Sequence, residues 1–170
     1  MKPHVYFLIL LLIIPVQAGL LDPLSLGGIK PDLALAVIYI IGLLTGPMEA
    51  ALAGMAIGLV QDIGSASFLG LSALTRGLIG LSAGQLGRRV LDLTSPSNSI
   101  FLAAFSILEG ICIALFLQLF HGSVPFLTLA VDRILPQALY TALLGALLLK
   151  LLGYKNVIPS LVRRDVQKEL

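Results

Sequence analysis

Charged residues are scarce in this chain of 170 residues, of which only 12% are Asp, Glu, Lys or Arg. An ordinary soluble domain has about 25%, and a globule of this size needs that polar surface to face water. Tryptophan is absent, and cysteine occurs once, as Cys112 in an apolar run. A single cysteine excludes an intramolecular disulfide and a cysteine zinc cluster. The composition therefore excludes a water-soluble enzyme, a disordered tail and a nucleic-acid-binding protein.

The residues that are present are mostly hydrophobic, at 58% of the chain, with a mean hydropathy of +1.02. A bilayer core about 30 Å thick needs about 20 apolar residues in a helix. Short polar gaps separate the apolar runs of this sequence, which predicts one all-α membrane domain, a compact bundle of six transmembrane helices over residues 1–153. The expected spans are 5–21, 33–45, 48–61, 68–87, 99–120 and 129–152, followed by a basic tail over 154–170.

Three of these segments leave alternatives open. The second and third runs are short, and Gly46-Pro47 separates them. We favour two short, tilted helices joined by a tight turn, because the residue before a proline avoids the α region; a re-entrant hairpin or one kinked helix is the alternative. The first run ends near Val16-Gln17-Ala18, which resembles a signal-peptide cleavage site. We favour a retained span, because the apolar stretch continues to Leu21.

The positions of the basic residues predict the orientation of the bundle. With six spans, both termini lie on the same side as the loop between the fourth and fifth spans. The loops expected on the opposite side, 22–32, 62–67 and 121–128, contain only Lys30. By the positive-inside rule, both termini are therefore expected in the cytoplasm of a bacterial inner membrane. The basic residues on that side are Lys2, Arg88, Arg89, Lys155, Arg163, Arg164 and Lys168.

Charged residues inside the expected spans are costly, at about 2.5–3.5 kcal/mol each on insertion scales. Asp32 and Glu49 lie near helix N-termini, where a carboxylate is favoured by capping and by the helix dipole. Arg76 and Glu109 lie near the middle of separate spans at similar depth. Because opposite charges in lipid seek each other, we expect Arg76 and Glu109 to form a buried interhelical pair or to share a polar cavity.

Small residues mark where neighbouring helices are expected to touch. Gly54 and Gly58 form a GxxxG pattern in the third span, and Gly80 and Gly84 form another in the fourth. In lipid, close backbone approach holds helices together, because no hydrophobic force acts between them. The two patterns predict a tight antiparallel contact within the chain, while association of two copies remains an open alternative.

No catalytic or metal-binding pattern is found in the sequence. His4 and His121 are isolated, and no phosphate-binding loop, nucleophile elbow or metal-ligand spacing is present. We therefore expect no enzyme activity, no cofactor and no metal.

Proline, glycine and aspartate motifs follow one another between residues 29 and 90. They are Ile29-Lys30-Pro31-Asp32-Leu33, Gly46-Pro47, Gly54-x-x-x-Gly58-Leu59-x-Gln61-Asp62, Phe68-Leu69-Gly70-Leu71, Leu78-Ile79-Gly80 and Gly84-Gln85-Leu86-Gly87-Arg88-Arg89. In this order they resemble the bacterial rod-shape-determining protein family MreD. The resemblance covers about the middle third of the chain, and the remaining spans agree only in number, length and hydrophobicity. The residues characteristic of the family would be Pro31, Asp32, Gly58, Asp62 and Gly70.

The resemblance implies a non-catalytic inner-membrane protein of the cell-elongation machinery. Its fold would be similar to the substrate-binding subunits of ECF vitamin transporters. Its partners would be membrane lipid, the single-span protein MreC, the peptidoglycan polymerase and transpeptidase, and the actin-like protein MreB. Because buried charges also suit a small-molecule site between helices, the alternative is a substrate-binding subunit of a vitamin-type transporter.

Overall fold

The computed structural model describes residues 25, 28–65, 69–87, 95–121 and 126–154. The expected span 5–21, most of the basic tail and the pair Arg88-Arg89 lie outside these residues. The described part is all-helical, and no strand occurs among its elements. The helices are α2 (Leu33–Thr45), α3 (Pro47–Ser65), α4 (Leu71–Gly87), α5 (Ser97–His121), α6 (Phe126–Leu129), the π-helix η2 (Ala130–Ile134) and α7 (Leu135–Tyr154).

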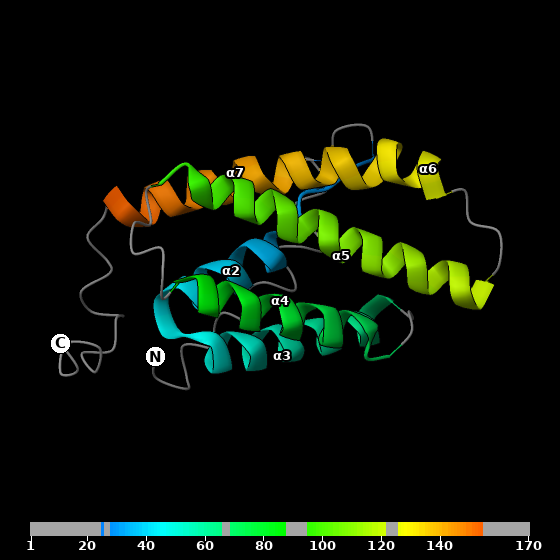
Figure 1. The fold of residues 1–170 in the computed structure, drawn as a ribbon, viewed down its shortest axis with the longest axis horizontal. Helices are drawn as coiled ribbons and strands as arrows, with labels where there is room; N and C mark the ends of the chain where they lie inside the picture. Colours follow the sequence, from blue (N-terminus) through cyan, green and yellow to red (C-terminus); the bar gives the residue numbers. More distant parts are fainter. Residues whose placement is uncertain (1–24, 26–27, 66–68, 88–94, 122–125, 155–170) are drawn as a thin grey trace.

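The helices form two pairs with α2 between them (Figure 1). One pair is α3 and α4, and the other is α5 with α7. Helix α2 contacts the members of both pairs, and most of its side chains are buried. Its residues Leu35 and Tyr39 pack with Ile79 of α4 and Leu102 of α5 in the main hydrophobic cluster. The central position of α2 explains why this helix is apolar on every side, with no stripe facing outward.

The Gly46-Pro47 dipeptide separates α2 and α3, as the sequence predicts, and the chain does not continue as one kinked helix. Gly46 has a φ of 122°, a backbone conformation that side-chain-bearing residues rarely adopt. Pro47 is the first residue of α3, where its missing N–H costs no helical hydrogen bond. Glu49 lies in the first turn of α3, the favourable position for a carboxylate.

The structure corrects two of the expected boundaries. Helix α3 continues past Asp62 to Ser65, and α4 begins at Leu71, three residues after its expected start. Arg76 therefore lies in the second turn of α4 and not near its middle. Asp62 remains inside α3 because its carboxylate has partners in α4, described below, that offset its helix-breaking tendency.

The last span is interrupted by the short π-helix η2. Pro136 follows it in the second position of α7 and has no N–H to donate to Asp132. The Leu135 N–H instead bonds to the Ala130 carbonyl, five residues earlier. A widened turn before a proline is a common way to accommodate it within a long helix.

Two described helical segments are long and apolar enough to cross a membrane, namely Ser97–Phe120 and Leu127–Leu151. Helix α2 has 13 residues, about 20 Å at 1.5 Å per residue, which is shorter than a bilayer core of about 30 Å. Helices α3 and α4 do not qualify, because glycine and polar residues lower their hydropathy. These helices therefore support membrane localisation but do not by themselves support six spans.

The described residues combine an apolar core with buried charges and an apolar outer surface. Charged and polar residues are buried, including Asp32, Asp62, Arg76 and Glu109. Large apolar side chains are exposed along the outer helix faces, in a spacing of three or four residues. Such a surface is suited to lipid and too apolar for water. The exposed residues on α3 are Met48, Leu52, Met55, Leu59 and Ile63, and those on α7 are Leu135, Leu139, Leu143, Leu147 and Leu151.

Candidate functional site

A buried cluster of charged and polar side chains joins four helices, and Arg76 lies at its centre. The Arg76 Nε donates to Glu109 Oε1 at 2.7 Å, and its Nη2 lies 2.5 Å from Asp32 Oδ2. The Arg76 Nη1 also donates to the side-chain oxygen of Gln61. Each charged side chain of this cluster is at most 8% exposed. The structure thus brings Arg76 and Glu109 together as the sequence predicts, and adds Asp32 and Gln61.

Asp32 has two tasks in this cluster. Its Oδ1 accepts a hydrogen bond from the Leu35 N–H at 2.9 Å, which caps the N-terminus of α2. Its other carboxylate oxygen pairs with Arg76. The Asp32 N–H donates to Thr141 Oγ1 of α7 at 2.9 Å, and Pro31 beside it is fully buried. The start of α2 is therefore tied to α4 and α7.

Asp62 caps α4 from the neighbouring helix. Its carboxylate accepts hydrogen bonds from the N–H groups of Gly70 at 2.9 Å and of Ser72 and Ala73 at 3.3 Å. These N–H groups have no partner within α4, because they belong to its first turn. Gly70 has a φ of 98°, which explains the need for glycine at this position. Two residues expected to be characteristic of the family, Asp62 and Gly70, therefore fix how α3 and α4 meet.

The two glycine patterns lie at the α3–α4 contact. A Cβ on Gly54 would collide with the backbone of Arg76, and one on Gly58 with the backbone of Ala73. A Cβ on Gly80 would collide with the backbone of Ala50, and one on Gly84 with that of Pro47. All four glycines thus allow close backbone approach within one chain. The Gly54 contact also sets the position of the Arg76 backbone beneath the charged cluster.

Sequence reasoning missed other polar contacts. The Tyr39 hydroxyl donates to Asn98 Oδ1 at 3.0 Å, which joins α2 to the start of α5. Thr141 and Asn98 are both fully buried, but an isolated threonine or asparagine in a sequence carries no signal of a distant partner. Gln61 directly precedes Asp62 near the end of α3. This position beside a buried carboxylate was the only signal in the sequence that Gln61 belongs to the cluster.

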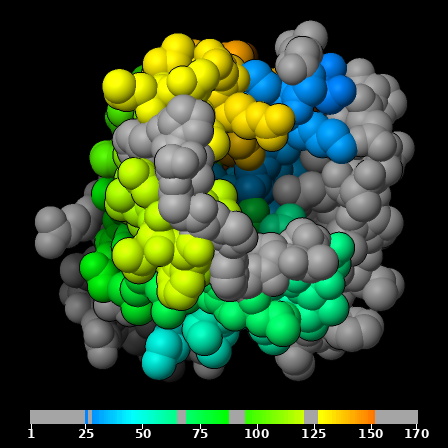
Figure 2. Space-filling model, turned by 90° about the vertical axis from the view of Figure 1, so that its right-hand side faces the viewer, coloured from blue at the N-terminus to red at the C-terminus, as the bar shows by residue number. Residues whose placement is uncertain are grey.

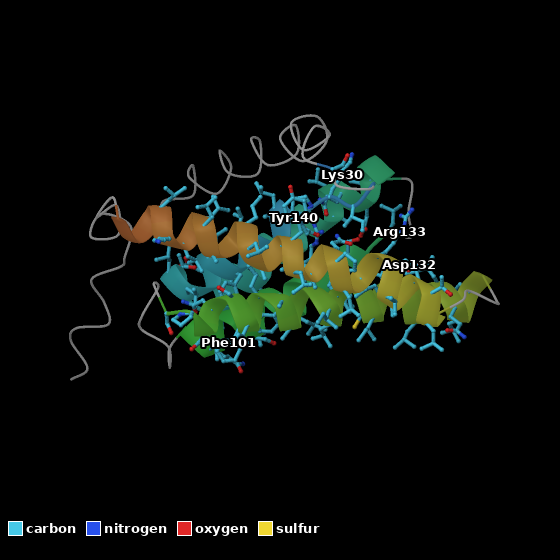
Figure 3. All side chains as sticks on the ribbon, turned by 90° about the horizontal axis from the view of Figure 1, so that it is seen from above. Lys30, Phe101, Asp132, Arg133 and Tyr140 are labelled. Atoms are coloured by element: carbon cyan, nitrogen blue, oxygen red, sulfur yellow. The ribbon has the colours of Figure 1, made fainter. Side chains whose placement is uncertain are left out.

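Three other charged residues are exposed to the surface. Asp132 and Arg133 are exposed on η2, as is Lys30 before α2. Figure 3 shows Lys30 and Arg133 in the same half of the molecule, away from Phe101 near the start of α5. An exposed position agrees with side chains that reach toward an interface.

A groove of 380 Å³ lies between α4 and α5 and is open on one side. Its walls are mostly apolar, and Glu109 is one of the polar residues that reach it. The groove therefore adjoins the charged cluster, because Glu109 belongs to both. The lining residues include Leu74, Thr75, Leu78, Ser82, Leu108, Glu109, Cys112 and Leu115.

Two carboxylates of the cluster contact one guanidinium. Asp32 and Glu109 carry two negative charges when both are ionised, whereas Arg76 carries one positive charge. Asp62 is engaged by backbone N–H groups of α4. Among the described residues, no group of three or more His, Cys, Asp or Glu side chains is arranged to hold a metal ion. The arrangement is suited to organising helices and to receiving a hydrogen-bond donor.

No family model, curated protein or solved structure matches this chain.

Proposed function

We propose that this chain is a six-span, non-catalytic protein of the bacterial inner membrane that serves the cell-elongation machinery. It would bind an MreC-like single-span protein within the bilayer and help couple MreB filaments to the enzymes of peptidoglycan synthesis. The observation that carries this proposal is the burial of Asp32, Asp62, Arg76 and Glu109 beneath outer helix faces of large apolar residues. A protein built in this way meets its partners in lipid or at the membrane surface.

The resemblance to the MreD family agrees with the positions of the residues on which it depends. Asp32 and Asp62 cap helices, Gly58 permits the α3–α4 contact, and Gly70 adopts a positive φ. Each of these residues therefore contributes to the packing of one helical bundle. We therefore propose that the residues shared with the family maintain the fold, and that partners bind elsewhere on it.

Six spans with both termini in the cytoplasm complete the proposal. Helices α2 and α3 would cross as a short, closely packed pair, since neighbouring helices can shelter a short span. The Arg88-Arg89 pair would then face the cytoplasm. A fluorescent protein fused after Arg89 is expected to fluoresce, whereas alkaline phosphatase fused there is expected to be inactive. Phosphatase activity at this position would contradict the orientation.

Depletion of the protein in its own bacterium tests the function. Rod-shaped cells are expected to become round, and a copy with Lys150→Ala, an exposed residue of α7, is expected to restore rods. Cells that remain rod-shaped without the protein would remove the assignment. Purification in mild detergent is expected to yield an MreC-like protein with one span and a large outer domain.

A second candidate function is small-molecule binding by a transporter subunit. Figure 2 shows the surface hollowed at one end of the molecule, between the residues of α6 and η2 and those of α3 and α4. A concave surface of this kind suits a small ligand. Purification with a pair of ATPase subunits and a bound vitamin, in place of a single-span partner, would favour this function.

A further inference from the structure

The groove between α4 and α5 lies where two helices that pack mainly against other helices meet. Helix α4 packs mainly on α3 and α2, and α5 packs mainly on α7. Helices α4 and α5 make few contacts with each other, and the 380 Å³ groove between them opens at the apolar surface. Leu74, Leu78, Leu108 and Leu115 line it and are also exposed. In a membrane, this opening would face lipid or another membrane-embedded chain.

Glu109 is only partly satisfied at the wall of this groove. Its Oε1 accepts a hydrogen bond from Arg76, but its Oε2 receives none from any described residue. The side chain is nevertheless only 6% exposed. A carboxylate offers about four acceptor positions, and a buried acceptor without a donor is destabilising. Glu109 therefore lines the groove and has one carboxylate oxygen without a donor among the described residues.

The apolar walls and the Glu109 oxygen together restrict what can fill the groove. A lipid acyl chain can occupy apolar space, but it has no donor for Glu109. Water can donate, but it gains little from walls formed by leucine side chains. A transmembrane helix offers both apolar contact and a donor. Its apolar side chains can insert into the groove while one polar side chain donates to Glu109.

We propose that the α4–α5 groove binds the transmembrane helix of a partner protein, and that this helix donates a hydrogen bond to Glu109 Oε2. The inference rests on the proposed function for the identity of the partner as a single-span protein. It goes beyond that function by assigning the face of the bundle, the depth of the contact and the chemistry of the partner's side chain. The partner helix is expected to carry Ser, Thr, Asn, Gln, Lys or Arg opposite Glu109.

The single native cysteine allows a direct test, because Cys112 lines the groove. Cysteines are placed one at a time along the transmembrane helix of the MreC-like protein, which is produced together with the full chain. Oxidation in isolated membranes is expected to give intermolecular disulfides at partner positions that recur every three or four residues. The control is Cys112→Ser combined with Leu143→Cys, which moves the thiol to an exposed position of α7 and is expected to give no such pattern.

A blocking variant gives a second readout. Ser82→Phe adds a ring to the wall of the groove, whereas Leu143→Phe adds one to the exposed face of α7. We expect Ser82→Phe to lower the amount of co-purified partner about tenfold, equivalent to about 1.4 kcal/mol, and Leu143→Phe to leave it unchanged. Equal co-purification with both variants would overturn the groove assignment.

The outcomes separate this inference from the proposed function. Disulfides from Leu143→Cys but not from Cys112 would overturn the groove and retain the partner. Absence of disulfides from both positions would also overturn the groove. In that case, co-purification of the unmodified chains still supports the proposed function, and its absence would count against that function as well.

Discussion

Replacement of Arg76 by methionine tests whether the charged cluster holds the bundle together. Methionine keeps an unbranched apolar stem but removes all three described side-chain partners of the guanidinium, namely Asp32, Gln61 and Glu109. Two buried carboxylates then lose the guanidinium that they contact. Breaking a buried ion pair by removing one partner costs about 3–5 kcal/mol. We expect Arg76→Met to lower the free energy of unfolding by at least about 3 kcal/mol.

Two further variants give this prediction its controls. Glu109→Gln leaves one carboxylate for one guanidinium and keeps an acceptor near Arg76, so it is expected to cost only about 1 kcal/mol. The triple variant Asp32→Asn, Arg76→Met, Glu109→Gln removes every charge of the cluster. Because replacing a whole buried ionic group is often neutral, the triple variant is expected to be more stable than Arg76→Met alone.

The assay is unfolding of the purified protein in mixed micelles with increasing dodecyl sulfate, followed by far-ultraviolet circular dichroism. Lys150→Ala is the control, because it removes a cation from an exposed position. If Arg76→Met were as stable as Lys150→Ala, the cluster would have no structural role. A triple variant less stable than Arg76→Met would show that the penalty does not come from unpaired charge.

The remaining expectations concern helix caps and close contacts, measured by the same unfolding assay. Asp62→Ala removes the acceptor for the first turn of α4 and is expected to cost about 1–2 kcal/mol; no loss would contradict the capping role. Gly80→Leu would force α4 away from the backbone of Ala50 and is expected to prevent folding, whereas Gly64→Ala, with open space around it, is expected to be tolerated. Thr141→Val leaves the buried Asp32 N–H without its acceptor, for an expected loss of about 1–3 kcal/mol; a stability equal to that of the native chain would show that the N–H has another partner.

The sequence predicts the helices well where apolar runs end at strong signals. The bounds of α2 agree at both ends, because Asp32 caps its start and Gly46-Pro47 ends it. The η2 segment was missed, although Pro136 lacks an N–H and indicates that a helix here must adjust. The start of α4 was placed too early, because capping by Asp62 depends on a contact between helices.

The candidate site could be predicted only in part, for a similar reason. Two opposite charges in separate apolar segments predict an ion pair, and Arg76 and Glu109 do pair. Asp32 was interpreted as a helix cap, which it is, but capping uses one carboxylate oxygen and leaves the other for Arg76. The groove depends on how α4 and α5 pack against the other helices, and no local pattern in the sequence encodes that packing.

The central claim is that the apolar outer faces of this bundle contact lipid while the cluster around Arg76 faces inward. Nitroxide labels in a Cys112→Ser background, attached at Leu52 and at Leu143 in reconstituted bilayers, test it most directly. Both positions are exposed and lie on opposite helix pairs. The account predicts frequent collisions with oxygen, which dissolves in lipid, and few with a water-soluble nickel chelate. Frequent collisions with the nickel chelate at both positions would contradict it.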